Sequence, residues 1–251
     1  METRMAEISK YIKLHKNVKL AELEALFPDI STMTLRRDLS KLEDIGEIVR
    51  THGGARSVDD ISRIKEELYT QRALENTDRK SVIAKKSINI PRIGHTIFLD
   101  TGTTIAALAE LLTDEKLLVL TPAPNIAIEC AKKPNVTVFV TGGFLNNDNL
   151  SLSGEWDSSF MADVSIDVAY MASSAYSLPS GFTCGSYNES VIKKEIISKA
   201  TKVVMLMDGT KLDKSMPFTF ARPKDIDVFV TDNVLPEEVS SEFINNKVEV
   251  L

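Results

Sequence analysis

The sequence has few of the residues that disulfide frameworks and metal sites require. It contains two cysteines, Cys130 and Cys184, which stand far apart and outside any Cys-x-x-Cys pattern. Its three histidines, His15, His52 and His95, have no carboxylate or cysteine neighbour at ligand spacing. We therefore expect no disulfide, no metal and no cofactor, and two buried thiols in a reducing compartment.

Long hydrophobic runs are also absent. No stretch approaches the length and apolarity of a membrane span, and the first residues contain no apolar run of signal-peptide length. Internal repeats and low-complexity tracts are missing as well. These absences lead us to expect a cytoplasmic protein with no membrane partner.

Positive charge is scarce over most of the chain. The formal net charge of the chain is −6. Residues 1–56 carry a small positive net charge, with 10 Lys and Arg against 9 Asp and Glu. The remaining residues hold 20 and 27. An acidic body argues against non-specific binding of nucleic acid, whereas the N-terminal part can face phosphates. A chain of 251 residues is long enough for one large domain and one small one.

The N-terminal residues have the pattern of a winged helix-turn-helix. Hydrophobic residues recur at helical spacing over residues 2–15 and 20–27, and Pro28 interrupts the pattern. Ser31 then supplies an N-cap for a third helix, in which leucines every three or four residues form one buried stripe. A short ribbon with a Gly53-Gly54 turn follows. Three short helices with a tight turn before the third predict a module that binds DNA.

The outward face of the third helix supplies the predicted DNA contacts. The first turns of a recognition helix reach base edges, and arginine can donate two hydrogen bonds to guanine. We expect Thr32, Thr34 and Arg36 to contact bases. The other DNA-binding candidates are Ser31 and His52, together with Arg37, Lys41 and Arg50 nearer the phosphates. The alternative is that Arg36 and Arg37 pair with Asp38 and Glu43 on a solvated helix face.

Strand and helix patterns alternate in the rest of the chain. The predicted strands are Thr96–Leu99, Leu117–Thr121, Val136–Thr141, Val168–Ala172, Lys202–Met207 and Asp227–Thr231, with Val248–Val250 as an edge strand. The predicted helices are Thr103–Leu112, Asn125–Lys132, Ser158–Asp163, Glu189–Ala200 and Glu237–Asn245. This alternation predicts an α/β fold with an open, mostly parallel sheet. We divide the chain into a winged helix-turn-helix domain (1–56), a partly helical linker (57–80) and an α/β effector domain (81–251).

Two loops at strand ends have the chemistry of an anion site. Ligands of open α/β sheets bind beyond the carboxyl ends of the strands. The loop at 100–104 offers a glycine, the amides of a helix start and two threonine hydroxyls, all of which suit a phosphate. The loop at 141–143 ends another strand with two glycines. Lys193 and Lys211 would supply positive charge. The alternatives are a surface pair of Lys193 with Glu189, worth about 0.3–0.5 kcal/mol, and a solvated turn lysine at 211.

These motifs, in this order, resemble the DeoR family of bacterial transcriptional regulators. The matching segments are Thr34-Leu-Arg-Arg-Asp-Leu39, Leu42-Glu43, Gly46, Arg50-Thr-His-Gly-Gly-Ala55, Leu99-Asp-Thr-Gly-Thr-Thr104, Thr141-Gly-Gly143 and Asp208-Gly-Thr-Lys211. The resemblance implies a repressor of a carbohydrate uptake or catabolism operon, with an effector domain similar in fold to ribose-5-phosphate isomerase. It also implies a homo-oligomer, a dimer or a multiple of dimers, that binds double-stranded operator DNA and a phosphorylated sugar or polyol. The matching effector-binding positions are Asp100, Gly102, Thr103, Thr104, Gly142, Gly143, Glu189, Lys193 and Lys211.

Three segments depart from the family pattern. Members commonly have Thr-Asn where this chain has Thr121-Pro122, and a glycine-containing run where it has residues 172–175, Ala-Ser-Ser-Ala. The usual Gly-Leu-Thr-Thr is replaced by residues 181–184, Gly-Phe-Thr-Cys. The phosphate end of the implied pocket is intact and the sugar end is altered, so we expect an unusual effector.

Two other functions compete with this interpretation. A sugar-phosphate isomerase with an accessory domain would need a positioned base, for which Asp100, Glu189 and Asp208 are candidates by position alone. A protein-interaction module could use the winged helix to bind another protein. We expect a regulator and not an enzyme, because an enzyme would leave the DNA-binding module unexplained. The interaction module shares every core feature with the regulator but predicts no salt-dependent affinity for DNA.

Overall fold

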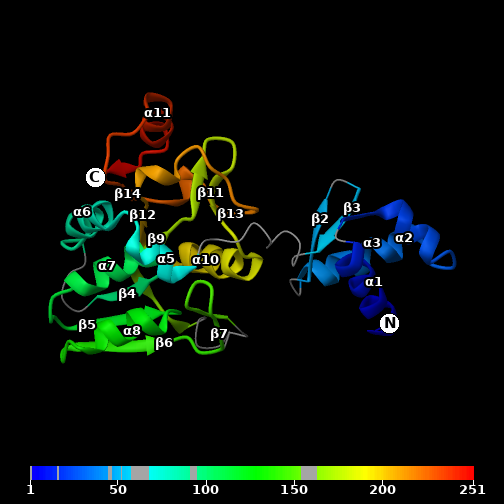
Figure 1. Ribbon diagram of the computed structural model, residues 1–251, viewed down its shortest axis with the longest axis horizontal. Coiled ribbons are helices and arrows are strands. Elements are labelled where there is room, and N and C mark those ends of the chain that lie inside the picture. Colours follow the sequence, from blue (N-terminus) through cyan, green and yellow to red (C-terminus); the bar gives the residue numbers. More distant parts are fainter. Residues whose placement is uncertain are drawn as a thin grey trace. The chain divides into compact units, whose positions relative to one another are not determined.

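The computed structural model describes residues 2–15, 17–44, 47–51, 53–57, 68–90, 95–153 and 163–251. The chain divides into two compact units, one made of residues 1–65 and 185–188 and the other of residues 66–184 and 189–251 (Figure 1). Within the described ranges, no helix combines the length and apolar character needed to cross a membrane.

The first unit is a winged helix-turn-helix, as predicted. Its elements are α1 (Glu2–His15), β1 (Asn17–Lys19), α2 (Leu20–Leu26), α3 (Thr32–Asp44), β2 (Ile48–Thr51) and β3 (Gly54–Ser57). The three strands form an antiparallel sheet in the order β1-β3-β2. Ile8 and Ile12 of α1 pack with Leu23 of α2 and with Leu35 and Leu39 of α3 in one buried cluster. The leucine stripe of the third helix is therefore confirmed as its core face.

Gly54 explains the glycine pair at the ribbon turn. A Cβ atom at this position would lie 2.0 Å from the carbonyl oxygen of Val18, closer than atoms can approach. Only glycine lets β3 pair with β1 at this point. The carbonyl of Gly53 accepts a hydrogen bond of 2.7 Å from the Leu20 amide, which ties the turn to the start of α2. The ribbon is thus fixed to the body of the helix-turn-helix.

The second unit is built on a seven-stranded sheet in which every pair is parallel. Its strands are β4 (Thr96–Leu99), β5 (Leu117–Thr121), β6 (Val136–Val140), β9 (Ile166–Ala172), β12 (Ala200–Leu206), β14 (Val228–Val230) and β15 (Glu249–Val250). The order is β15-β14-β12-β9-β4-β5-β6. From β4, the chain adds β5 and β6 toward one edge of the sheet. It then returns to place β9 beside β4, and adds β12, β14 and β15 toward the other edge. The predicted open parallel sheet is confirmed.

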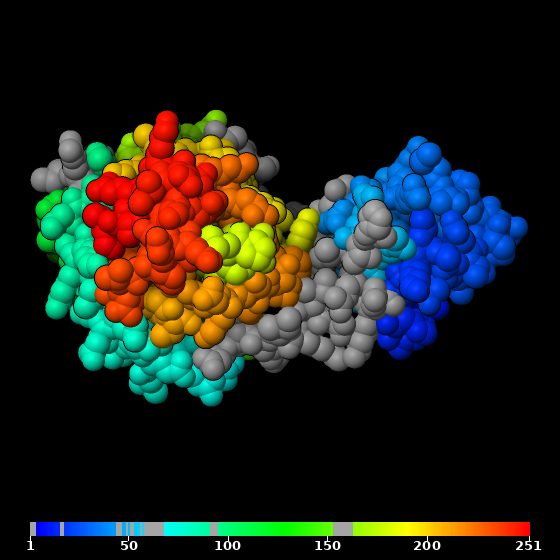
Figure 2. Space-filling view, turned by 90° about the horizontal axis from the view of Figure 1, so that it is seen from above, coloured from blue at the N-terminus to red at the C-terminus, as the bar shows by residue number. Residues whose placement is uncertain are grey.

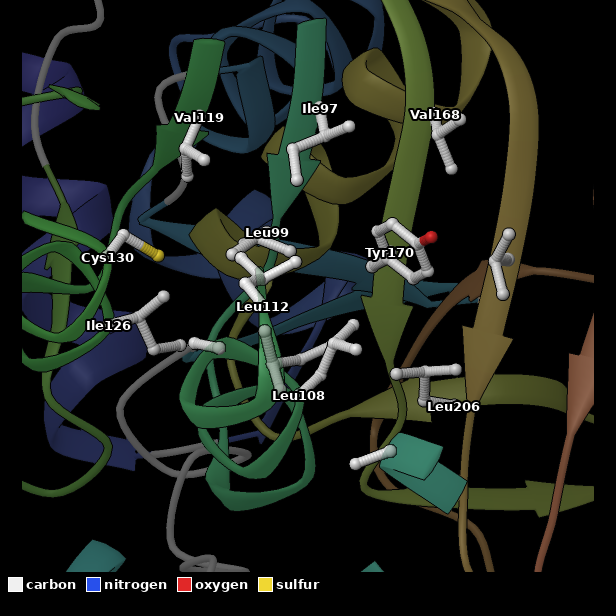
Figure 3. Packing of buried hydrophobic residues seen from close by; sticks show 14 of the residues in the cluster. Ile97, Leu99, Leu108, Leu112, Val119, Ile126, Cys130, Val168, Tyr170 and Leu206 are labelled. Carbon is white, nitrogen blue, oxygen red and sulfur yellow. The ribbon is translucent and has the colours of Figure 1, made fainter. Parts of the chain in front are cut away.

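Helices cover both faces of this sheet. They are α5 (Tyr69–Leu74), α6 (Thr77–Ser87), α7 (Thr103–Leu111), α8 (Pro124–Ala131), α10 (Tyr187–Lys199) and α11 (Glu237–Asn245). Figure 3 shows the core on one face, where Leu99 of β4 and Tyr170 of β9 pack with Leu108 of α7 and Ile126 of α8. Figure 2 shows α11, in red, at the surface of the unit.

An aromatic cluster fills the core on the other face. The rings of Phe229 and Phe243 stack with centroids 4.7 Å apart, and Tyr176 lies 5.5 Å from Phe243. Phe182 lies 4.7 Å from Tyr176 and is fully buried. The phenylalanine that departs from the family pattern at position 182 therefore serves the core.

Short elements that the sequence did not predict complete the unit. They are the hairpin β7 (Phe144–Asn146) and β8 (Ser151–Ser153), the antiparallel strands β10 (Ala175–Ser177), β11 (Gly181–Cys184) and β13 (Phe218–Ala221), and the 3-10 turns η1 (Gly209–Lys211) and η2 (Pro223–Asp225). The predicted strands of the sheet agree with the observed strands to within two residues at each end. The predicted helices within the described residues show shifts of similar size. The predicted helix at 158–163 lies, except for Asp163, outside the described residues.

Candidate functional site

The start of α3 is fixed by the predicted cap. The amide of Thr34 donates to the hydroxyl oxygen of Ser31 at 3.3 Å, and the two hydroxyl groups lie 2.9 Å apart. Thr32, two residues before Thr34, donates its hydroxyl to Glu24 of α2 at 2.7 Å. The candidates for base contact at the start of the helix are thus held in place by neighbours in the turn between α2 and α3.

The exposed face of α3 carries the predicted cations. Thr32, Arg36, Arg37 and Lys41 are exposed, and Thr34 is partly exposed. Asp38 is buried and accepts a hydrogen bond of 2.7 Å from Arg4 of α1. In the described part of this unit, neither Asp38 nor Glu43 pairs with Arg36 or Arg37, so the solvated-pair alternative is not what the structure contains.

Arg50 lies on β2, next to the ribbon turn. Its amide donates to Glu43 at 2.9 Å, and its guanidinium lies 3.9 Å from the same carboxylate. This contact connects the ribbon to the last turn of α3, so Arg50 extends the basic surface of the helix. His52, the remaining DNA-binding candidate, lies outside the described residues.

The second unit has a pocket at the point where its strand order reverses. β4 and β9 are neighbours in the sheet, although their following helices lead away in opposite directions. Open α/β sheets form their ligand crevice at this place. The pocket residues include Thr101, Gly102, Thr103 and Thr104 after β4, Ala172, Ser173 and Ser174 after β9, Glu189 and Lys193 of α10, Lys211 after β12, and Arg72 of α5.

The β4 side of the pocket is the N-terminus of α7. Gly102 is the residue before the helix and has φ +112°, a conformation that other residues adopt only with strain. The first turn of α7 contains no acidic residue. Its amides and the hydroxyls of Thr103 and Thr104 therefore face the pocket without a competing carboxylate on the same turn. Such a helix start favours an anion.

Lys193 forms the floor of the pocket, and Asp100 lies behind it. The ammonium of Lys193 donates to Asp100, to the carbonyl of Ala172 at 2.9 Å, and lies 3.1 Å from Glu189. Burial lowers the pKa of Lys193, but the carboxylates of Asp100 and Glu189 outweigh it, so the pKa lies above the usual lysine value. Lys193 is 3% exposed. The predicted i, i+4 pair with Glu189 exists, but it is buried and not on the surface.

Asp100 is held by three donors. One oxygen accepts from the Thr101 amide at 2.8 Å, and the other accepts from Lys193 and from the Ala172 amide at 2.9 Å. The carboxylate thus joins the end of β4 to the end of β9. This role differs from direct ligand contact, because Asp100 lies behind the residues that line the pocket.

Lys211 and Arg72 complete the positive side of the pocket. Lys211 lies in the turn after β12, where its ammonium donates to the Ser173 carbonyl at 3.3 Å. Arg72 comes from α5, within the polar segment that the sequence indicated only as a linker. Thr101, Ser173 and Ser174 also line the pocket, and the sequence did not predict them there. The signal for the two serines was available, since residues 172–175 were noted as a departure from the family pattern.

Gly142 and Gly143 are not brought to this pocket. They follow β6, which lies two strands from β4 at the edge of the sheet, and both are exposed. The described residues that line the pocket include neither of them. Gly142 and Gly143 do lie at the edge where the parallel strands end, as the sequence predicted. The sequence pattern does not show the order of the strands, so it could not show that β5 lies between β4 and β6.

Comparison with known proteins agrees with this architecture. A family model described as "DeoR-like helix-turn-helix domain" matches residues 4–60, and one described as "DeoR C terminal sensor domain" matches residues 75–233. The chain belongs to the DeoR family. It is a helix-turn-helix transcriptional regulator with a C-terminal sensor domain.

Relatives within the DeoR family match along most of the chain. The HTH-type transcriptional regulator GlpR of Haloferax volcanii is 34% identical over 222 residues, which cover 88% of this chain and 86% of the relative. The regulator GolR of Listeria innocua is 29% identical over 96% of this chain and 94% of its own length. Among solved structures, ribose 5-phosphate isomerase A of Methanocaldococcus jannaschii aligns over 55% of each chain with a TM-score of 0.41 and 16% identity.

Proposed function

We propose that this DeoR-family regulator represses a carbohydrate uptake or catabolism operon under the control of a phosphorylated sugar or polyol. The observation that carries the proposal is the pocket between β4 and β9, where a helix start, two threonine hydroxyls and the cations Arg72, Lys193 and Lys211 converge. A phosphate monoester fits this set of donors and charges. Repression is the simplest mode of action, because a bound protein can block a promoter without further contacts.

In this proposal the two units divide the work. Residues 1–56 bind double-stranded operator DNA, residues 81–251 sense the effector, and residues 57–80 connect them, with α5 packed in the sensing unit. Recognition helices act in pairs on palindromic half-sites, so the protein works as a homo-oligomer in the cytoplasm, as a dimer or a multiple of dimers. An effector changes operator affinity only if it binds the DNA-competent and DNA-incompetent states differently.

The geometry of Asp100 speaks against the isomerase alternative. An enolising enzyme needs a carboxylate that can take a proton from the substrate. Asp100 already accepts hydrogen bonds from two amides and from Lys193. Both oxygens of Asp100 are therefore occupied by donors of the protein, and Asp100 is not among the residues that line the pocket. Asp100 is therefore not placed to act as the base that an isomerase needs.

Thermal unfolding of the whole protein tests the effector class. Sugar and polyol phosphates are each compared with the unphosphorylated parent compound. A ligand at about one hundred times its dissociation constant adds roughly 2.7 kcal/mol to the folded state, which shifts the midpoint by several degrees. A shift with a phosphorylated compound, and none with its parent, supports the proposal. No shift across the panel contradicts it.

Selection of binding sites from a random pool of duplex DNA tests the regulator part. The recovered sequence should contain inverted half-sites about one helical turn apart, and binding should weaken steeply with salt. Addition of the stabilising phosphate compound should change the affinity for that sequence. Recovery of a single unrepeated half-site would contradict the paired arrangement.

A further inference from the structure

Lys193 has no donor left for a ligand. A lysine ammonium carries three N–H donors, and three oxygens lie around that of Lys193, from Asp100, Ala172 and Glu189. An anion in the pocket therefore needs its direct cationic partners elsewhere. The charge balance leads to the same result, because Lys193 with Asp100 and Glu189 is a group of net charge −1, which repels a phosphate.

Arg72 and Lys211 are the lining cations that reverse this balance. Both face the same pocket as the start of α7, and Nη2 of the Arg72 guanidinium is buried. With these two side chains the pocket carries a net charge of +1. A guanidinium can also donate two parallel hydrogen bonds to phosphate oxygens, which a lysine cannot do. Arg72 thus has both the charge and the geometry that the site lacks without it.

The helix that carries Arg72 is weakly attached. α5 has six residues, none of them buried. No side chain caps its N-terminus with a hydrogen bond. It lies over a cavity of about 240 Å³ that is lined by residues of α5, α6 and α7, including Tyr69, Ala73 and Leu111. A helix above such a space has few packing contacts to hold it in one position.

A small set of polar contacts holds α5 in place. The amide of Tyr69 donates to Asp148 at 2.8 Å, and Asn125 donates to its hydroxyl at 2.8 Å. At the other end, the ammonium of Lys80 donates to the carbonyls of Arg72 and Glu75. Burial lowers the pKa of Lys80, and the charge of Lys211 lowers it further. The carboxylates of Asp208 and Glu75 act in the opposite direction, so Lys80 ties α5 to α6 among charges of both signs.

We propose that Arg72 and Lys211, and not Lys193, grip the anionic group of the effector, and that α5 docks firmly on α7 when this group is bound. The inference rests on the proposed function, since it names the residues and the responding helix of the same site. α5 is the first described helix of the sensing unit after the DNA-binding unit along the chain.

The test uses the full chain with inorganic phosphate and with the phosphorylated compound that stabilises the wild type most. Binding is measured by calorimetry, and hydrogen exchange is followed at residues 68–75 and 101–106. The variants are Arg72→Gln, Arg72→Lys and the control Gln71→Ala, an exposed neighbour on the same helix. A thermal unfolding curve without ligand confirms that each variant is folded.

The expected results separate the two proposals. In the wild type, ligand slows exchange at both segments. Arg72→Gln weakens binding roughly 10- to 100-fold and, at saturating ligand, leaves residues 68–75 unprotected while 101–106 remain protected. Arg72→Lys restores part of the affinity, and Gln71→Ala behaves as wild type. Equal binding by wild type and Arg72→Gln overturns this inference alone. Failure of every phosphorylated compound to bind the wild type overturns the proposed effector class and this inference with it.

Discussion

The ammonium of Lys193 and the carboxylate of Asp100 form an ion pair in which the side chains are 3% and 4% exposed, although 93 residues separate them in the chain. Lys193 comes from α10 and Asp100 follows β4. The pair therefore connects the two halves of the sheet at the place where the strand order reverses, with Lys193 lining the pocket and Asp100 behind it.

Replacing Lys193 by methionine should destabilise the sensing unit. Removal of one partner leaves the other as an uncompensated buried charge, which costs about 3–5 kcal/mol. Urea unfolding of Lys193→Met measures this loss, and Lys194→Met, at the exposed neighbouring position, is the control. Adding Asp100→Asn to Lys193→Met should recover part of the stability. A loss below about 1 kcal/mol in the single variant would mean that the pair contributes little.

Replacing Lys211 by alanine should weaken effector binding without unfolding the protein. Lys211 is partly exposed and its ammonium donates to the carbonyl of Ser173. Loss of one charge-assisted contact to a phosphate should raise the dissociation constant roughly 10- to 100-fold. Operator affinity in the absence of ligand should stay the same. The control is Lys214→Ala, an exposed lysine three residues later, and equal effects of both changes would argue for a general charge effect.

Arg36 and Arg37 should differ in what they contribute to DNA binding. Alanine at Arg36 should cost about 1–3 kcal/mol and relax specificity at one base pair. Alanine at Arg37 should weaken binding to all sequences and lower the salt slope by about one. Fluorescence anisotropy with the selected operator, and with variants of it at each base pair, measures both. Equal losses on cognate and random DNA for Arg36→Ala would assign that residue to the phosphates.

The first unit should lose stability in acid through Glu47. The hydroxyl of Ser9 is the main cause that lowers the pKa of Glu47 below its ordinary value of 4.5, and Lys13 adds to the effect. A lowered folded-state pKa gives stability that is complete above the unfolded value and is lost as the pH falls through the folded one. Ser9→Ala should therefore reduce stability by about 1 kcal/mol at pH 7, with the difference vanishing in acid.

Hydrogen exchange at the buried Ile12 and Leu39 reports this change, since both lie in the core of the first unit. Ser40→Ala is the control, a serine on α3. A difference between Ser9→Ala and wild type that persists at the same size below pH 3 would show that the contact acts through packing and not through the charge of Glu47.

Much of the fold could be predicted because its signals are local. The parallel strands are buried hydrophobic runs, and the caps and breaks at Ser31 and Pro28 depend on residues a few positions away. The short strands β10, β11 and β13 could not be predicted in this way. They are three or four residues long, and their pairing joins segments far apart in the chain.

The pocket could be predicted only in part. The start of α7 is a local feature, and the sequence located it through Gly102 and its threonines. Strand order is not local, so the glycines after β6 were grouped with a site that lies two strands away. Arg72 lies in a charge-rich segment whose composition is that of a solvated linker, and only tertiary contacts bring it to the pocket.

The side-by-side position of β4 and β9 has a consequence for how the specificity of such a regulator can change. In the proposed site the anion faces the start of α7, Arg72 and Lys211, whereas the walls beside it come from residues 172–174 at the end of β9, about 70 positions after the loop that follows β4. Mutations in the second loop can reshape the space for the rest of the ligand while the phosphate grip stays intact. One scaffold can thus acquire a new effector through a few substitutions, and in this chain the Ala-Ser-Ser-Ala segment is the place where such substitutions would occur.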